Sequence, residues 1–155
     1  MNTADIRPRR FFFSRITFYM TVLALAGCAV VPPPATPEEA LARTPVSDSN
    51  AVIALAEAAR ADTDGGNFIK AAAALERALR IEPRNPRLWH ELAQLKLKEG
   101  DYAQATNMAA RSNTWAGTDK TLRAANWRLI GEAKRSLGDE TGAHAAFDKA
   151  DALTR

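Results

Sequence analysis

The chain has 155 residues, with 21 Lys and Arg against 18 Asp and Glu, a formal net charge of +3. Four of the arginines and one aspartate lie within residues 1–27, so the rest of the chain holds 17 basic and 17 acidic groups. A general nucleic-acid binder carries a clustered surplus of Lys and Arg, and two His with one Cys are too few for a zinc site or a disulfide framework. These counts exclude both classes and leave room for one domain with a tail.

Residues 1–28 have the features of an export signal. An arginine-rich start precedes an apolar run from Ile16 to Ala26, about 11 residues long and too short to span a bilayer. The sequence Leu25-Ala26-Gly27-Cys28 then resembles the lipobox of bacterial lipoproteins, in which the leader is cleaved before a cysteine that receives lipid. The resemblance implies lipid attachment at Cys28 and, because Ala29 and not an aspartate follows, delivery to the outer membrane. The alternative is a buried free cysteine.

Lipidation of this kind implies a protein that is anchored to the membrane without spanning it. Several acyl chains give stable anchoring because each buried methylene contributes about 0.8 kcal/mol. Arg9-Arg10 followed by Phe12 has some likeness to a twin-arginine signal, while the leader as a whole favours the general secretory route. The sequence does not decide between the two routes, and both lead to a periplasm-facing, outer-membrane protein.

Residues 29–49 contain five of the eight prolines, mixed with Ala, Ser and Thr. We expect an extended, mobile linker of the polyproline II type, because the segment lacks apolar residues to bury. At about 3.1 Å per residue it reaches at most roughly 65 Å, which keeps the folded part near its membrane. Thr36-Pro37-Glu38-Glu39 has a capping-box pattern, which predicts a transient turn or two between Pro37 and Arg43, too short to be stable alone.

From residue 51 onward alanine and leucine recur at helical spacing, which predicts an all-helical domain. Glycine, aromatic and small residues also recur in a fixed order. Gly66, Phe68 and Ala71 recur 34 residues later as Gly100, Tyr102 and Ala105. Trp89, Gly100 and Ala105 recur 38 residues later as Trp127, Gly138 and Ala143. This period resembles the tetratricopeptide repeat (TPR), whose helix–turn–helix units stack into a solenoid. The resemblance implies an all-α domain over residues 50–155, with repeats at about 52–85, 86–119 and 124–155 forming a short right-handed solenoid.

Local signals agree with this division. Asn85 is a suitable N-cap for a helix that starts at Pro86, and glycine followed by a polar residue marks the turn within each repeat. Four residues are added before the third repeat, about one helical turn, so we expect the fifth of the six repeat helices to be one turn longer and to be capped by Thr118 or Asp119. The last helix is expected over residues 140–153.

Trp115 lies in the irregular stretch between the second and third repeats. We favour the interpretation that its side chain fills the space left by the small Ala109, since a buried tryptophan contributes about 3–5 kcal/mol. The alternative is an exposed loop contact for a partner, and Trp115 is therefore also a candidate contact.

Groups that support catalysis do not come together in the sequence. His90 and His144 are 54 residues apart on different repeats, the thiol of Cys28 is expected to carry lipid, and no glycine-rich phosphate loop follows a strand. We therefore expect that the protein is not an enzyme, has no catalytic residue and binds neither a metal nor a cofactor. Helical repeats of this kind usually bind segments of other proteins.

In the TPR family the first helix of each repeat lines a concave groove. Transferred residue by residue, the resemblance gives a groove with five basic side chains against Asp64 and Glu132, which suits an acidic or polar peptide. The alternative is that these side chains form ordinary solvated helix surfaces. The carboxylate clamp of chaperone-binding repeats does not transfer, because its Lys and Asn positions hold Ala56, Arg60, Glu91, Ala125 and Leu129. The candidate groove contacts are Arg60, Arg87, His90, Gln94, Lys98, Arg128 and Arg135.

Four short motifs between residues 112 and 128 resemble small outer-membrane TPR lipoproteins of Gram-negative bacteria: Ser112-Asn113, Ala116-Gly117, Leu122-Arg123 and Asn126-Trp127-Arg128. That group includes lipoproteins that activate a bifunctional penicillin-binding protein, the synthase that polymerises and crosslinks peptidoglycan. The resemblance implies a membrane-anchored activator of such a synthase. The alternatives are a pilotin-like or outer-membrane assembly adaptor, and a structural module without a dedicated client.

Overall fold

The computed structural model describes residues 36–155, so the expected signal peptide, the lipidation of Cys28 and the first part of the expected linker lie outside the described residues. Every regular element between residues 36 and 155 is a helix. None of these helices is long and apolar enough to cross a membrane. The helices are α2 (Pro37–Ala42), α3 (Asn50–Asp64), α4 (Phe68–Ile81), α5 (Pro86–Lys98), α6 (Tyr102–Trp115), α7 (Lys120–Ser136) and α8 (Glu140–Thr154).

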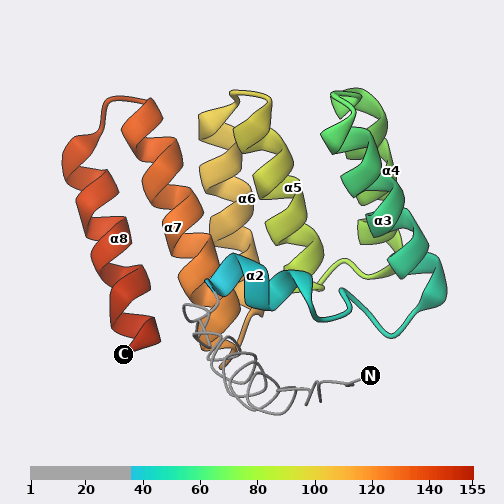
Figure 1. Cartoon of the computed structure of the whole chain (residues 1–155), viewed down its shortest axis with the longest axis horizontal. Coiled ribbons are helices and arrows are strands. Elements are labelled where there is room, and N and C mark those ends of the chain that lie inside the picture. Colours follow the sequence, from blue (N-terminus) through green and yellow to red (C-terminus); the bar gives the residue numbers. More distant parts are fainter. Residues whose placement is uncertain (1–35) are drawn as a thin grey trace, which may run out of the picture. The chain divides into compact units, whose positions relative to one another are not determined.

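Six of the helices form three hairpins that stand side by side. α3 packs on α4, α5 on α6 and α7 on α8, and successive hairpins meet through α4 with α5 and α6 with α7. The short helix α2 crosses in front of the hairpins and packs on α7 (Figure 1). The predicted all-α fold of three stacked TPR units is confirmed.

Polar caps and glycines set the boundaries of these helices. The Asn85 side chain accepts hydrogen bonds from two backbone N–H groups at the start of α5, and Asp119 does the same for one N–H of α7. Each turn within a hairpin contains a glycine with φ between 75° and 81°, at Gly66, Gly100 and Gly138. A side chain is disfavoured there by about 1 kcal/mol or more, so glycine ends the first helix of each repeat.

Small residues let the paired helices approach closely. Ala59, Ala71 and Ala93 are buried at the positions where the repeat expects small side chains. Gly131 has the same role in α7, because a Cβ atom built there would lie 2.5 Å from Cε1 of Phe147 in α8. The third hairpin therefore combines a glycine with an aromatic ring, whereas the first combines Ala59 with Leu75 in the corresponding places.

The extra four residues before the third repeat lengthen α7 as predicted. This helix has 17 residues, compared with 13 in α5. Its N-cap is Asp119, whose carboxylate accepts a hydrogen bond of 2.9 Å from the backbone N–H of Leu122. Because four residues make about one turn, the buried face of α7 keeps its register with its neighbours.

The expectation of an extended, mobile linker up to residue 49 is wrong for residues 36–46. Both bonds of the capping box at Thr36 and Glu39 are formed, and α2 is a helix of six residues. Leu41 and Val46 are each only 6% exposed, the first in a cluster with α7 residues and the second in the core cluster built by α3, α4 and α5. Two apolar side chains in a polar stretch are enough to dock it, and packing stabilises a helix that would be marginal alone.

Candidate functional site

A groove of about 420 Å³ lies between α3 and α5 and is bounded on one side by α2. Five of the seven predicted groove contacts line it, namely Arg60, Arg87, His90, Gln94 and Lys98. The further polar lining residues of α3 and α5 are Thr63, Asp64 and Glu91, and α2 contributes Glu38, Leu41 and Ala42.

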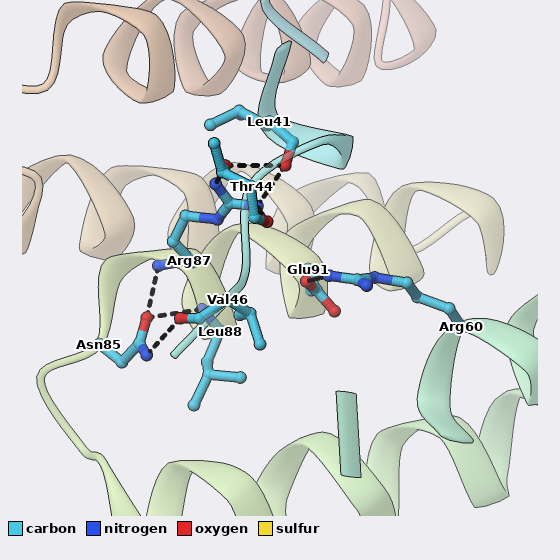
Figure 2. Close-up of polar contacts among 8 residues, drawn as sticks. All are labelled: Leu41, Thr44, Val46, Arg60, Asn85, Arg87, Leu88 and Glu91. Carbon is cyan, nitrogen blue, oxygen red and sulfur yellow. Dashed lines mark hydrogen bonds and ion pairs between the residues drawn. The ribbon is translucent and has the colours of Figure 1, made fainter. Parts of the chain in front are cut away.

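Arg60 and Lys98 each pair with a carboxylate across the groove. Arg60 of α3 pairs with Glu91 of α5 (Figure 2), and burial raises the pKa of Glu91 against the opposing effect of Arg60. Lys98 of α5 lies 3.0 Å from Asp64 of α3, in a pair whose two side chains are largely exposed. An exposed pair of this kind contributes little, about 0–1 kcal/mol, so Lys98 remains available to a ligand.

Arg87 is bound by the chain's own leading segment. Its guanidinium donates to the carbonyl oxygen of Leu41 and to both the hydroxyl and the carbonyl oxygen of Thr44 (Figure 2). Beside this contact, the side-chain amide of Asn85 donates to the carbonyl oxygen of Val46 at 2.9 Å. Burial lowers the pKa of Arg87. These bonds fix residues 41–46 over the start of α5.

His90 faces a buried polar chain that also sets its tautomer. The carbonyl oxygen of Pro86 can only accept, so the Ser112 hydroxyl donates to it at 2.7 Å. The Ser112 oxygen then accepts from the Asn126 amide at 2.7 Å, and Asn113 accepts a second bond from the same amide at 3.0 Å. The Asn126 oxygen is left to accept a hydrogen bond of 2.8 Å from the protonated Nδ1 of His90.

This arrangement leaves the Nε2 atom of His90 as an unprotonated acceptor without a partner among residues 36–155. The side chain is 4% exposed, and burial lowers its pKa from 6.5 to about 4. His90 is therefore neutral near pH 7. It lines the groove as a buried wall and not as an exposed contact.

Two of the predicted groove contacts lie elsewhere. Arg128 of α7 reaches Asp151 of α8 at 3.6 Å, and the guanidinium of Arg135 lies 5.7 Å from the centre of the Phe147 ring in α8. Both cations therefore pair within the third hairpin. Glu132 lies between them on the exposed surface of α7, and partial desolvation together with the charge of Glu38 in α2 raises its pKa.

Trp115 does not fill the space beside Ala109. Its side chain is 40% exposed, and the guanidinium of Arg84 lies 5.2 Å from its ring centre. Ala109 is fully buried in a cluster that includes Leu129 and Ile130 of α7. The buried interpretation is thus wrong, and the exposed ring remains a candidate contact.

Two residues that shape the groove were not predicted as contacts. Glu91 partly neutralises the basic lining, and its position four residues after Arg87 on α5 was the available signal. Leu41 covers one side, and its signal was an isolated leucine in a proline-rich stretch. Within residues 36–155 no cluster of His, Cys, Asp and Glu could hold a metal ion. The lining combines charged, amide and carbonyl-binding groups, which suits the binding of a peptide.

The fold and the lining define a class, that of TPR modules that bind other proteins. The tetratricopeptide repeat family matches residues 63–125. The solved globular C-terminal domain of P. aeruginosa LpoP is similar with 39% sequence identity and a TM-score of 0.66, over 68% of this chain and 99% of that chain. The chain therefore belongs to the tetratricopeptide repeat family, with a repeat domain like that of LpoP. None of the curated proteins compared matches it.

Proposed function

We propose that this protein is a lipid-anchored regulator at the outer membrane that binds and activates a bifunctional penicillin-binding protein through its TPR domain. The observation that carries the proposal is the 39% identity to the LpoP domain over nearly its whole length. The lipobox at Cys28 and the motifs between residues 112 and 128, which resemble those of lipoprotein activators of this synthase, support it.

The groove supplies a physical means of binding. Peptide carbonyl and carboxylate oxygens are acceptors, and the exposed cation of Lys98, the Gln94 amide and Arg87 provide donors along α5. Arg60 is already paired with Glu91, so it orients that carboxylate more than it attracts a partner. Binding of a synthase segment here would couple the anchored domain to the enzyme without chemistry of its own.

Purified protein comprising residues 29–155 retains every residue that the structure describes, and it should bind the synthase and raise its rate of glycan polymerisation. Lys98→Glu reverses an exposed charge in the groove and should weaken binding about tenfold or more. Lys70→Glu makes the same change on the exposed surface of α4 and serves as the matched control. In cells, deletion of the gene should increase sensitivity to β-lactams. A protein that neither binds nor stimulates the synthase would refute the proposal.

A further inference from the structure

Residues 36–46, which we call the strap, lie along the edge of the groove on α5 and α7. The strap crosses in front of α5 and α7, which are first helices of two repeats (Figure 1). Three of its residues form one side of the groove, and the hollow continues beyond them toward Gln94 and Lys98. The strap thus covers part of the surface on which α5 presents its polar side chains.

The contacts of the strap have the form of peptide recognition. Leu41 is an apolar anchor, buried in a cluster with Ala116, Leu122 and Ala125. Three residues later the backbone leaves α2 and turns its oxygens toward Arg87, which donates to Leu41 and Thr44 (Figure 2). A short helix with a leucine, followed by an oxygen-rich turn, is the chemistry that this face accepts.

Other contacts show that the strap is a poor occupant. The charge of Glu38 adds to the raised pKa of the exposed Glu132 on α7, so the strap brings one negative charge toward another. The Arg87 guanidinium is partly buried, yet its bonds to the strap go only to neutral oxygens. A carboxylate would bind that cation more strongly, because it adds an opposite charge and can accept two parallel hydrogen bonds from the guanidinium. The helix of the strap has six residues, and a helix that short is expected to lose its order once it is released.

We propose that the strap is a displaceable occupant of the α5 and α7 surface beside the groove, and that the partner binds there through a short helix with a leucine anchor followed three residues later by a carboxylate that pairs with Arg87. The choice of this surface as the partner's site rests on the proposed function. The recognition of the strap itself does not depend on which protein the partner is. Binding of the partner and docking of the strap are then mutually exclusive.

The decisive probe is a synthetic peptide with the sequence of residues 35–48, added to protein comprising residues 29–155. Wild-type protein should bind it weakly, because the tethered strap competes. Leu41→Asp releases the strap and should raise the apparent affinity at least about tenfold, since burial of one leucine shifts an equilibrium by roughly one to two decades. Arg43→Ala, an exposed change on the strap without a contact to the groove, is the matched control and should leave the affinity unchanged.

Two further measurements test the chemistry. Arg87→Ala combined with Leu41→Asp should abolish peptide binding. The peptide with Thr44→Asp should bind the Leu41→Asp protein more tightly than the unmodified peptide, by about threefold or more, because a carboxylate replaces a hydroxyl at Arg87. If circular dichroism shows that Leu41→Asp impairs folding, Glu39→Gly replaces it as the variant that releases the strap. Glu39→Gly removes the exposed capping-box side chain and leaves the core intact.

Equal peptide affinity of the wild-type and strap-released proteins, or peptide affinity that is insensitive to Arg87→Ala, would overturn the inference. The synthase provides a second measurement. Tighter synthase binding by Leu41→Asp than by wild type is expected, and weaker binding would show that the strap contributes to the interface and is not displaced. If neither form binds the synthase, the proposed function fails while the peptide measurement still decides the recognition of the strap.

Discussion

The buried histidine makes the stability of the repeat domain depend on pH. Burial lowers the pKa of His90 from 6.5 to about 4 in the folded protein, so between these values the unfolded chain binds more protons than the folded one. The free energy of unfolding should therefore be highest above pH 6.5 and should fall as the pH falls toward 4. The difference between the pKa of His90 in the unfolded and folded protein corresponds to about 3 kcal/mol of stability, at about 1.4 kcal/mol per pKa unit.

Protonation is unfavourable because the hydrogen-bond chain fixes the proton on Nδ1 and leaves Nε2 buried. A second proton would place a charge at an atom without a partner among the described residues. Burial raises the pKa of Glu91 and Glu132, and these carboxylates act with the opposite sign in mild acid. The quantity that isolates His90 is thus the difference in pH dependence between the wild type and His90→Gln.

The assay is urea unfolding of residues 29–155, followed by circular dichroism at pH 4, 5, 6 and 7. At pH 7 we expect His90→Gln to be less stable by about 1–3 kcal/mol, because the buried hydrogen bonds are disturbed. Between pH 7 and 4 the wild type should lose about 3 kcal/mol more than the variant. His144→Gln changes the exposed second histidine and should retain the wild-type slope. Parallel pH profiles for the wild type and His90→Gln would refute the reasoning.

Three other substitutions test the packing. Gly131→Ala gains about 1 kcal/mol of helix propensity, but it forces the ring of Phe147 to move at a cost of about 1–3 kcal/mol. The Tm should therefore fall, and Phe147→Leu in the same chain should restore it. A raised Tm would contradict the close contact. Asp119→Ala removes the cap of α7 and should cost about 1 kcal/mol in urea unfolding. Arg87→Ala should speed amide hydrogen exchange in residues 37–42 and leave α7 protected, and unchanged exchange in that helix would show that it is held without the guanidinium.

The repeat domain could be predicted from the sequence because its signals are local. Glycine at a positive φ, aspartate or asparagine at a helix start and small residues at a fixed period each act within one or two turns of the chain. Gly131 is an example, since the repeat pattern asks for a small residue there and the Phe147 ring needs the space. The inserted turn of α7 followed from residue counting alone.

The groove was harder to predict because its properties depend on pairs between distant segments. Five predicted contacts do line it, but Arg128 and Arg135 turn to α8, where an aspartate and an aromatic ring lie within reach. The docking of Leu41 against α7 joins residues about 80 positions apart, and no local pattern encodes that. The net charge of the lining likewise depends on Glu91 and Glu38, which single-helix positions did not weigh.

The docking of the strap also bears on the reach of the anchored domain. If lipid is attached at Cys28, as proposed, only the seven residues 29–35 separate the anchor from the docked strap, and seven residues reach at most about 22 Å at 3.1 Å per residue. Release of the strap frees the chain up to residue 49 and extends the span to roughly 65 Å. A partner that displaces the strap would therefore bind the domain and lengthen its tether in the same step. The longer tether would then be present only in protein molecules whose strap a partner has displaced.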